Sequence, residues 1–465
     1  MGRFDDSFAE ARTLPFWLDR GDAPEPQPPL SGEATCDLAI VGAGFTGLWA
    51  AIEARRRDPA RDVVVLEAQT AAFGASGRNG GFVEASLTHG LHNGVDRFPD
   101  EIAKLEELGE QNLAAIEATI RNHAIAADYE PNGMITVARA PHEVEHLSAA
   151  VEDLAQHGHD AVWLDQDAVR AEVNSPTYLG GLWQRSGSGI VDPVGLAVGL
   201  RRVALELGVR LHEHTPVTDL RELPSGVELV CRDATVRARR VLLATNGFPP
   251  LLRAIRRYIV PVYDYVLVTE PLSERHRQAI GWRNRQGVGD AMNQFHYYRL
   301  TSDDRILWGG YDAIYHFGNA VDPRLEQRHA TFSLLAENFF ATFPQLEGLR
   351  FTHRWAGVID TCSRFCVMWG TAMSGRVSYA VGYTGLGVAA TRFGAVVALD
   401  LVDGVDNDVV RMDFVRSKPI PFPPEPLRWL GVQLTRRELA RADRNNGRRG
   451  LYLRALDRLG LGFDS

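Results

Sequence analysis

The chain has 465 residues, more than one hydrophobic core usually supports, so we expect more than one domain. Its apolar share of 45% is ordinary for a globular protein, and its net charge of -9 excludes a general nucleic-acid binder, because phosphate affinity needs a concentrated positive surface. The richest apolar stretch, residues 379–402, contains Arg392 and Asp400, so we expect no membrane-spanning helix.

The first 34 residues include four prolines between positions 24 and 29, which is typical of an extended arm on the surface. The beginning of the chain is acidic and lacks the apolar stretch of a secretory signal. The four cysteines are scattered, so we predict a cytoplasmic protein without structural disulfides. Cys362 and Cys366 have no second pair with zinc-type spacing, and no metal site is predicted.

The first apolar run, residues 38–41, is typical of a parallel strand covered on both faces. The sequence GAGFTG follows it and leads into a helix-forming segment that reaches residue 57. In such a strand, turn and helix, Gly42 makes the tight turn, Gly44 lets a diphosphate approach the backbone, and Gly47 lets the helix pack on the strand. Amide groups at the start of the helix, at Phe45 and Thr46, then face the phosphates.

A second apolar run, residues 63–66, ends at Glu67, twenty residues beyond Gly47. A carboxylate at this position can accept hydrogen bonds from both ribose hydroxyls of a dinucleotide. Strand, helix, strand and acid in this register predict a Rossmann-like dinucleotide site. The pattern suits a nicotinamide or a flavin equally well.

Residues 73–81 read FGASGRNGG and follow Glu67 after a short spacer. Small residues let the backbone run against the flat face of a flavin, where a side chain would collide. Arg78 would place a cation near the reactive ring atoms and favour the negative charge that develops when a flavin is reduced.

This segment resembles the FAD-binding start of the D-amino-acid-oxidase-like flavoenzymes, which include glycine oxidase, sarcosine oxidase and the gamma-glutamylputrescine oxidoreductases. GASGRNGG is most similar to the last group. The resemblance implies an α/β fold in which a discontinuous Rossmann-like FAD-binding domain carries an inserted mixed-sheet substrate domain. It also implies FAD as the cofactor and oxidation of the carbon next to an amine.

Further segments resemble the same family. Residues 189–193, before an amphipathic helix at 194–207, resemble the return of the chain into the FAD domain. Residues 208–211 and Val217 resemble the strand and the backbone contact that hold adenine, and residues 241–247 resemble a strand that ends in a polar turn beside the cofactor.

Near the end of the family's pattern, residues 355–358 resemble the final FAD strand, and residues 382–388 resemble the glycine loop before the last long helix. Backbone amides of that loop would face the pyrimidine oxygens of the flavin. The motif and the resemblance together give as cofactor-binding residues Gly42, Gly44, Phe45, Thr46, Gly47, Glu67, Ala68, Ala75, Ser76, Arg78, Asn79, Gly80, Gly81, Val217, Asn246, Gly247, Gly357, Gly382, Thr384, Gly385, Leu386, Gly387 and Val388.

We predict an N-terminal arm at 1–34, a FAD-binding domain formed by 35–95, 180–250 and 350–403, a substrate domain formed by 96–179 and 251–349, and a C-terminal extension at 404–465. Within the inserts, periodicity predicts a helix at 102–122 and strands at 260–269, 296–300 and 305–309. The extension is proline-rich and then arginine-rich and helical over residues 429–459; a solvated charged face is the default interpretation, and the extension could also cap the fold or contact a partner subunit.

The second insert is rich in aromatic residues, which exclude water and can hold an alkylammonium ion by cation–π attraction, although such residues are as often plain sheet packing. Four residues are candidates for catalysis: Arg78 beside the flavin, His296 as a proton handler by residue type, and Tyr298 with Arg299, which resemble the gamma-glutamylputrescine group. Arg299 could clamp a distal carboxylate or be structural.

The expected reaction is hydride transfer from the carbon beside an amine, or an amino acid, to flavin N5, followed by hydrolysis of the imine to an aldehyde or keto product. An amino-acid or 2-hydroxy-acid dehydrogenase and a non-catalytic FAD-binding subunit are the alternatives. Val358 stands where sarcosine-oxidase-type enzymes carry a flavin-linking cysteine, which favours non-covalent FAD. Neither Lys104 nor Lys418 lies in a flavin-facing segment, so either oxygen or another acceptor could reoxidise the flavin.

Overall fold

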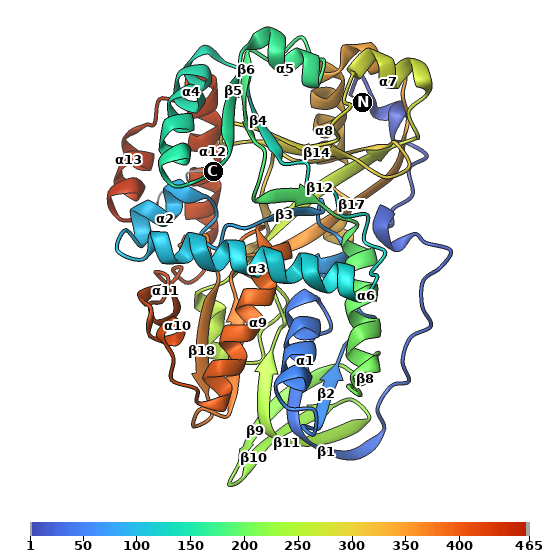
Figure 1. Ribbon diagram of the computed structural model, residues 1–465, viewed down its shortest axis with the longest axis vertical. Helices are drawn as coiled ribbons and strands as arrows, with labels where there is room; N and C mark the ends of the chain where they lie inside the picture. Colours follow the sequence, from blue (N-terminus) through green and yellow to red (C-terminus); the bar gives the residue numbers. More distant parts are fainter. Residues whose placement is uncertain (1, 462–465) are drawn as a thin grey trace.

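The protein contains two large β-sheets, which occupy the two halves of its long axis in a computed structural model that describes residues 2–461 (Figure 1). In the first sheet six strands follow the order β18-β19-β11-β1-β2-β8, and β10 and β9 continue from β11. The central pairs are parallel, as the apolar runs predicted. The strands are β1 (Gly32–Val41), β2 (Val63–Leu66), β8 (Arg210–His212), β9 (Val217–Leu223), β10 (Gly226–Cys231), β11 (Ala234–Leu243), β18 (Met368–Ala372) and β19 (Val377–Val381).

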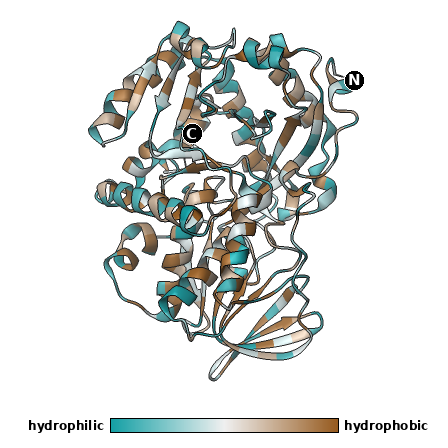
Figure 2. Cartoon of the chain, turned by 45° about the vertical axis from the view of Figure 1, so that its right-hand side comes forward, coloured by the Kyte–Doolittle hydropathy of each residue, from teal (hydrophilic) through white to brown (hydrophobic). Residues whose placement is uncertain are grey.

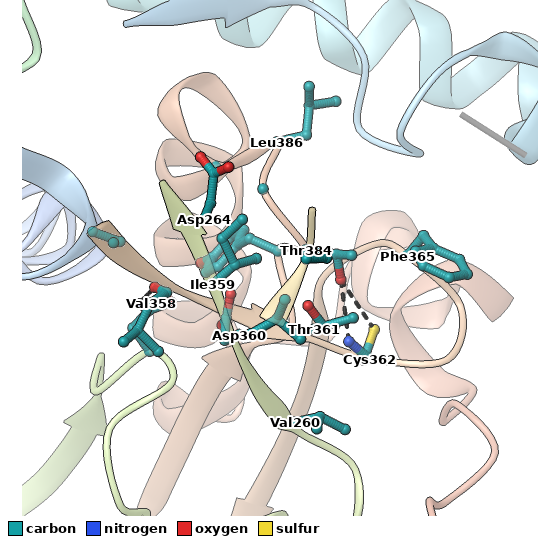
Figure 3. A pocket seen from close by; sticks show the side chains of 18 of the residues that line it. Val260, Asp264, Val358, Ile359, Asp360, Thr361, Cys362, Phe365, Thr384 and Leu386 are labelled. Carbon is teal, nitrogen blue, oxygen red and sulfur yellow. Dashed lines mark hydrogen bonds between the residues drawn. The ribbon is translucent and has the colours of Figure 1, made fainter. Parts of the chain in front are cut away.

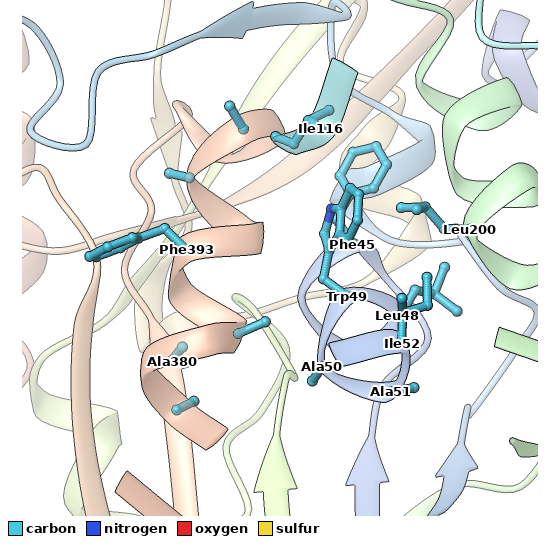
Figure 4. Close-up of a cluster of buried hydrophobic side chains, with 14 of the residues drawn as sticks. Phe45, Leu48, Trp49, Ala50, Ala51, Ile52, Ile116, Leu200, Ala380 and Phe393 are labelled. Carbon is cyan, nitrogen blue, oxygen red and sulfur yellow. The ribbon is translucent and has the colours of Figure 1, made fainter. Parts of the chain in front are cut away.

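Both faces of this sheet are covered, because successive side chains of a strand point to opposite sides. Leu38 and Ile40 of β1 join a core with the helices α1 (Phe45–Arg57), α6 (Pro193–Glu206) and α9 (Gly387–Asp403). Ala39 and Val41 face a second core, formed with β10 and β11. Figure 4 shows the first core, where Phe45, Leu48, Trp49 and Ile52 of α1 lie between Leu200 of α6 and Phe393 of α9.

The second sheet has nine strands in the order β16-β12-β15-β14-β13-β4-β6-β5, with β17 paired to β12. The helix α8 (His329–Thr342) packs on it through Phe332 and Phe339. The strands are β4 (Met134–Ala138), β5 (Ala161–Leu164), β6 (Gly180–Gln184), β12 (Val260–Thr269), β13 (Gly287–Asp290), β14 (His296–Leu300), β15 (Ile306–Gly310), β16 (Ile314–Tyr315) and β17 (Phe351–Thr361).

A two-stranded sheet of β3 (Phe82–Glu84) and β7 (Ser188–Ile190) lies where the two halves meet. The long helix α3 (Ile102–Asn122) crosses the same region (Figure 1) and buries Leu105, Leu113 and Ile116, whose spacing gives it one apolar face. The remaining helices are α2 (Leu91–Arg97), α4 (Pro141–Gln156), α5 (Gln166–Glu172), α7 (Glu274–Ile280), α10 (Asp408–Arg411), α11 (Asp413–Arg416), α12 (Leu427–Arg444) and α13 (Leu451–Arg458). In Figure 2 the helices of the molecule carry both hydrophilic and hydrophobic residues along their length.

Several predicted elements differ from the observed ones. The strands β6 and β17 pair within the larger sheet, although the predicted FAD-domain segments 180–250 and 350–403 contain them. The N-terminal arm is not only superficial, since Phe8 and Trp17 are buried and the Trp17 indole N–H donates to the Asn79 carbonyl oxygen at 2.9 Å. The helical extension is broken between α12 and α13. The domain boundaries remain a prediction.

Within residues 2–461 no helix is both long enough and apolar enough to cross a bilayer. All four cysteines are buried and free.

Candidate active site

A cavity of about 1220 Å³ lies between the two sheets. Drug-sized ligands typically occupy about 300–1,000 Å³, so this space suits a larger ligand or a ligand with a substrate beside it. Its walls include the turn and loops around β1 and β2, the segment after β11, the loop before α9, the larger sheet, and the C-terminal helices α12 and α13.

The turn between β1 and α1 forms one end of the cavity. Gly42 has φ of +106°, and a Cβ built there would lie 2.6 Å from the Ala244 carbonyl oxygen. A Cβ at Gly47 would lie 1.9 Å from the Gly42 carbonyl oxygen, so helix and turn meet without a side chain between them. Gly47 itself does not line the cavity. The N-cap residue of α1, Gly44, has no side chain to cap the helix, and the positive end of the helix dipole lies toward the cavity; of the two predicted phosphate-facing amides, the Phe45 N–H donates to the Ser76 hydroxyl.

Glu67 lies directly after β2 and lines the cavity. Its carboxylate accepts hydrogen bonds from the backbone N–H groups of Ala43, at 2.7 Å, and Gln69, at 2.8 Å. Burial raises the pKa of Glu67, and these two donors act against that rise. Glu67 therefore fixes the glycine turn and also presents carboxylate oxygens where the sequence predicts the ribose.

The FGASGRNGG segment is held in shape by Asn79. Its side-chain amide donates to the carbonyl oxygens of Ala75 and Ser76, at 2.8 and 3.0 Å, and its oxygen accepts the Gly81 N–H at 2.8 Å. The Ser76 hydroxyl accepts the Phe45 N–H at 2.9 Å, which ties this segment to the start of α1. The segment from Phe73 to Gly80 lines the cavity except for Gly77. It is thus a rigid wall made largely of backbone.

Arg78 lines the cavity, but its charge is not free. Its guanidinium donates to Glu326 at 2.6 Å and to the carbonyl oxygens of Phe73 and Ala356, at 2.9 and 3.2 Å. Burial is the main influence on Glu326 and raises its pKa, whereas Arg78 lowers it. The cation that the sequence predicts beside the flavin is therefore half of an ion pair with Glu326.

The loop before α9 forms another part of the wall. Thr384, Gly385, Leu386, Gly387 and Val388 line the cavity, and α9 begins there without a side-chain cap. Like the start of α1, this helix start adds partial positive charge to the wall.

Beside this loop, Figure 3 shows Asp360 and Ile359 of β17 with Thr384 and Cys362. The Gly382 N–H donates to the Asp360 carboxylate at 2.6 Å, and burial raises the pKa of Asp360 to about 7. The Cys362 thiol donates to the Cys366 carbonyl oxygen at 3.2 Å, so it is engaged although it lies in the wall.

Two further cavity residues were not among the four catalytic candidates, although one of them, Tyr297, belongs to the aromatic residues of the second insert. Asp264 of β12 and Tyr297 of β14 line the cavity, and the Tyr297 hydroxyl donates to the Asp264 carboxylate. Burial raises the pKa of Asp264 to about 6. The period-two alternation of β14 is the signal that could have found Tyr297, since it faces away from its neighbours His296 and Tyr298.

His296, Tyr298 and Arg299 do not line the cavity, which corrects the expectation that they contact substrate. The His296 imidazole donates from Nδ1 to the Gly309 carbonyl oxygen at 3.1 Å and accepts from Asn338 at 3.0 Å. Burial lowers the pKa of His296 to about 3, so the ring is neutral and committed to these partners.

Tyr298 is hydrogen-bonded to the Tyr178 hydroxyl at 2.6 Å and to Asp290 at 3.2 Å within the core. Arg299 donates to the carbonyl oxygens of Gly81 and Val191, at 3.1 and 2.6 Å, so it braces the end of the glycine segment. Burial lowers the pKa of Arg299 to about 10.

Of the predicted cofactor residues, all but four lie in the cavity wall, and those four are glycines. Beside Gly47, a Cβ at Gly81 would meet the Val191 carbonyl oxygen at 2.2 Å, one at Gly247 would meet Val358 at 2.8 Å, and one at Gly382 would meet Cys362 at 3.1 Å. These glycines allow close packing behind the wall. Asn246 lines the wall and donates to the Val358 carbonyl oxygen at 3.2 Å.

Comparison with known proteins identifies the family. The family model described as "FAD dependent oxidoreductase" matches residues 37–400. Gamma-glutamylputrescine oxidoreductase from Escherichia coli is similar, with 31% identity over 402 residues that cover 85% of this chain and 89% of that protein. A probable oxidoreductase, OrdL, from Haemophilus influenzae is 30% identical over 392 residues, which cover 82% of this chain and 86% of that protein.

Solved structures share the fold. Glycine oxidase from Geobacillus kaustophilus superposes with a TM-score of 0.68 at 20% identity, covering 83% of this chain and 99% of that one. L-proline dehydrogenase from P. horikoshii gives a TM-score of 0.67 at 17% identity, covering 83% and 97%. The predicted fold, a Rossmann-like FAD domain with a substrate domain, is confirmed.

Proposed function

The chain belongs to the D-amino-acid-oxidase-like family of FAD-dependent oxidoreductases, and from that premise we propose that it oxidises the carbon next to the nitrogen of a gamma-glutamylputrescine-like amine. The family membership makes it an FAD-binding enzyme that acts on amine or amino-acid substrates. In the proposed reaction the amine loses a hydride and a proton to become an imine, which water hydrolyses to an aldehyde.

The residues of the cavity fit an extended FAD. The N-terminal end of α1 would hold the diphosphate, Glu67 the adenosine ribose, and Val217 the adenine side. The redox ring would lie between the backbone wall of residues 73–80 and the start of α9. FAD bound there supplies the hydride acceptor that no side chain can provide.

The protein's own contribution is to enclose and polarise the site. The uncapped start of α9 favours negative charge at its end of the cavity, and the paired Arg78 adds a fixed dipole opposite. Aromatic side chains of the larger sheet, Tyr297 and Tyr311, exclude water from the substrate side. The observation that carries the proposal is that one cavity joins the dinucleotide cradle to this aromatic and acidic wall.

The electron acceptor is part of the proposal. Neither Lys104 nor Lys418 lies in the cavity wall, so no lysine is placed to activate oxygen among residues 2–461. Reoxidation then depends on another cation or on an acceptor other than oxygen.

The test is anaerobic mixing of the purified holoprotein with gamma-glutamylputrescine, simple alkylamines, amino acids and 2-hydroxy acids. Bleaching of the visible flavin absorption by the amines supports the proposal. Bleaching by amino acids or hydroxy acids alone would refute it. Admission of air with a peroxide assay then separates an oxidase from a dehydrogenase.

A further inference from the structure

The short strand β3 places one carboxylate in the cavity directly after the glycine segment. Side chains alternate along a strand, and here Val83 is buried in the core whereas Phe82 and Glu84 line the cavity. The strand is fixed by antiparallel pairing to β7 and by the Arg299 bond to the Gly81 carbonyl oxygen. Glu84 is therefore held at a defined place in the wall.

Glu84 differs from the other carboxylates of the cavity because no protein group satisfies it. Within residues 2–461 its carboxylate has no hydrogen-bond or ion-pair partner, and burial alone raises its pKa to about 7. By contrast, Asp264 accepts from Tyr297, Asp360 accepts from the Gly382 N–H, and Glu67 accepts from Ala43 and Gln69. A half-buried carboxylate without a partner is costly unless a ligand supplies one.

The surroundings of Glu84 suit an organic cation. Phe82 lies on the same face of β3, and its ring meets Tyr297 edge-on with centroids 5.6 Å apart. A Cβ at Gly80 would lie 2.6 Å from the Tyr297 ring, so the tyrosine packs directly on the glycine segment. Aromatic faces beside a carboxylate are the usual recognition chemistry for an alkylammonium ion.

The cavity's cations are occupied by protein groups. Arg78 is paired with Glu326, and Arg436 of α12 is paired with Asp312. Arg428 donates to the Asn319 side chain at 2.8 Å and to the Pro423 carbonyl oxygen at 2.9 Å. Among the described residues, two of the three arginines of the wall are thus ion-paired and the third is hydrogen-bonded, so a carboxylate on the reacting carbon would meet the charge of Glu84 and would compete with protein groups for these cations.

We propose that Glu84, with the rings of Phe82 and Tyr297, binds the ammonium group of the substrate, so that the site selects alkylamines over α-amino acids. The inference rests on the proposed function and narrows its substrate class. Glu84 also accepts one proton from the bound ammonium: an N–H bond breaks, an O–H bond forms on the carboxyl, and the neutral amine that remains can release a hydride.

The test separates binding from turnover by using two ligands of the same shape that cannot be oxidised. tert-Butylamine carries no hydrogen on the carbon next to nitrogen, and pivalate replaces its ammonium by a carboxylate. Titration of each into the holoprotein, followed by the shift of the visible flavin spectrum, gives dissociation constants without catalysis. We expect wild type to bind tert-butylamine more tightly than pivalate, and Glu84→Gln to weaken tert-butylamine by about ten- to a hundredfold.

The matched control is Glu110→Gln, which makes the same change on the exposed side of α3 near Gly187, outside the cavity. It should leave both dissociation constants within about twofold, and Glu84→Asp should restore part of the affinity. Equal tert-butylamine affinity in wild type and Glu84→Gln, or tighter pivalate than tert-butylamine binding by wild type, would overturn the inference. Because these ligands need no turnover, failure of every amine to bleach the flavin would refute the proposed function separately.

Gamma-glutamylputrescine and its analogue with a carboxylate on the carbon next to the terminal amine provide the matching turnover comparison. We expect the reduction rate at low concentration to fall by about tenfold or more with the carboxylated analogue, and Glu84→Gln to narrow that difference. An equal rate for both compounds in wild type would contradict the selectivity.

Discussion

Replacing Gly42 or Gly44 of the first turn by alanine is expected to affect different properties of the protein: stability for Gly42, and ligand binding for Gly44. Gly42 has φ of +106°, a conformation that L-residues rarely adopt, and its new methyl group would lie 2.6 Å from the Ala244 carbonyl oxygen. Gly44 has φ of -80° in an extended conformation, and its new methyl group would approach only the Ser76 hydroxyl, at 2.9 Å. Gly42→Ala therefore strains the backbone, whereas Gly44→Ala mainly obstructs the ligand.

The magnitudes follow from these contacts. A residue forced into a sparsely populated backbone region costs about 1–3 kcal/mol, which for Gly42→Ala in a chain of 465 residues corresponds to a fall in Tm of about 1–3 °C in flavin-free protein. Gly44→Ala should cost no more than about 1 kcal/mol of stability, because the Ser76 hydroxyl can rotate away at the expense of its bond from the Phe45 N–H. Loss of one amide–phosphate hydrogen bond at Gly44 should weaken FAD binding about ten- to a hundredfold.

The assay measures Tm of the flavin-free variants and their FAD dissociation constants by quenching of flavin fluorescence on reconstitution. We expect Gly42→Ala to lower Tm and to raise the FAD dissociation constant, and Gly44→Ala mainly to raise the FAD dissociation constant. A wild-type Tm for Gly42→Ala would refute the strain argument. FAD affinity within about threefold of wild type for Gly44→Ala would refute the approach of a diphosphate to this backbone.

Three other substitutions test the residues that support the cavity wall. Arg299→Met removes the side-chain donor of the buried Val191 carbonyl oxygen and one of the two donors of the Gly81 carbonyl oxygen, which keeps the Val191 N–H. It should destabilise the protein by about 1–3 kcal/mol, seen as a lower Tm, and a wild-type Tm would contradict the bracing role. The pKa of Asp360 is raised from an ordinary 3.8 to about 7, so its ionisation lowers the stability of wild type progressively as pH rises from 4 to 7. Asp360→Asn should therefore have a free energy of unfolding up to about 4 kcal/mol higher than wild type above pH 7, and no higher near pH 4. A difference that does not change with pH would contradict this sign. Asp443 of α12 accepts hydrogen bonds from the backbone and side chain of Asn293 and from the Gln294 N–H, and both partners line the cavity. Asp443→Ala should therefore loosen this loop and raise KM about three- to tenfold with unchanged FAD content. An unchanged KM would show that the C-terminal extension does not shape the substrate side.

Local pattern was enough to predict much of the secondary structure. The helix at residues 102–122 and the strands at 63–66, 260–269 and 296–300 have the observed bounds. The spacing of apolar side chains predicts each of these elements, because that spacing lies within the residues of the element itself. The glycine motifs also lead to the cavity, because they encode backbone conformations that few other residues can adopt.

The same pattern could not predict which side chains of a buried strand face the cavity and which face the core. The strand β14 is flanked by packing on both sides, so every residue from His296 to Leu300 is a credible site residue in the sequence. The fold turns Tyr297 toward the cavity and His296 and Tyr298 into the core, where each has protein partners. Arg78 likewise forms an ion pair with Glu326, which lies 248 positions away in the sequence.

By itself the sequence determined the family, the cofactor and the backbone wall of residues 73–81, since these depend on residues that are neighbours along the chain. Tertiary structure alone decided that β6 and β17 pair within the larger sheet and that α12 and α13 complete the cavity. It also decided that the Glu84 carboxylate has no hydrogen-bond or ion-pair partner among residues 2–461. Such outcomes depend on which distant segments pack together, and the free energy of that packing is not recorded in any short stretch of residues.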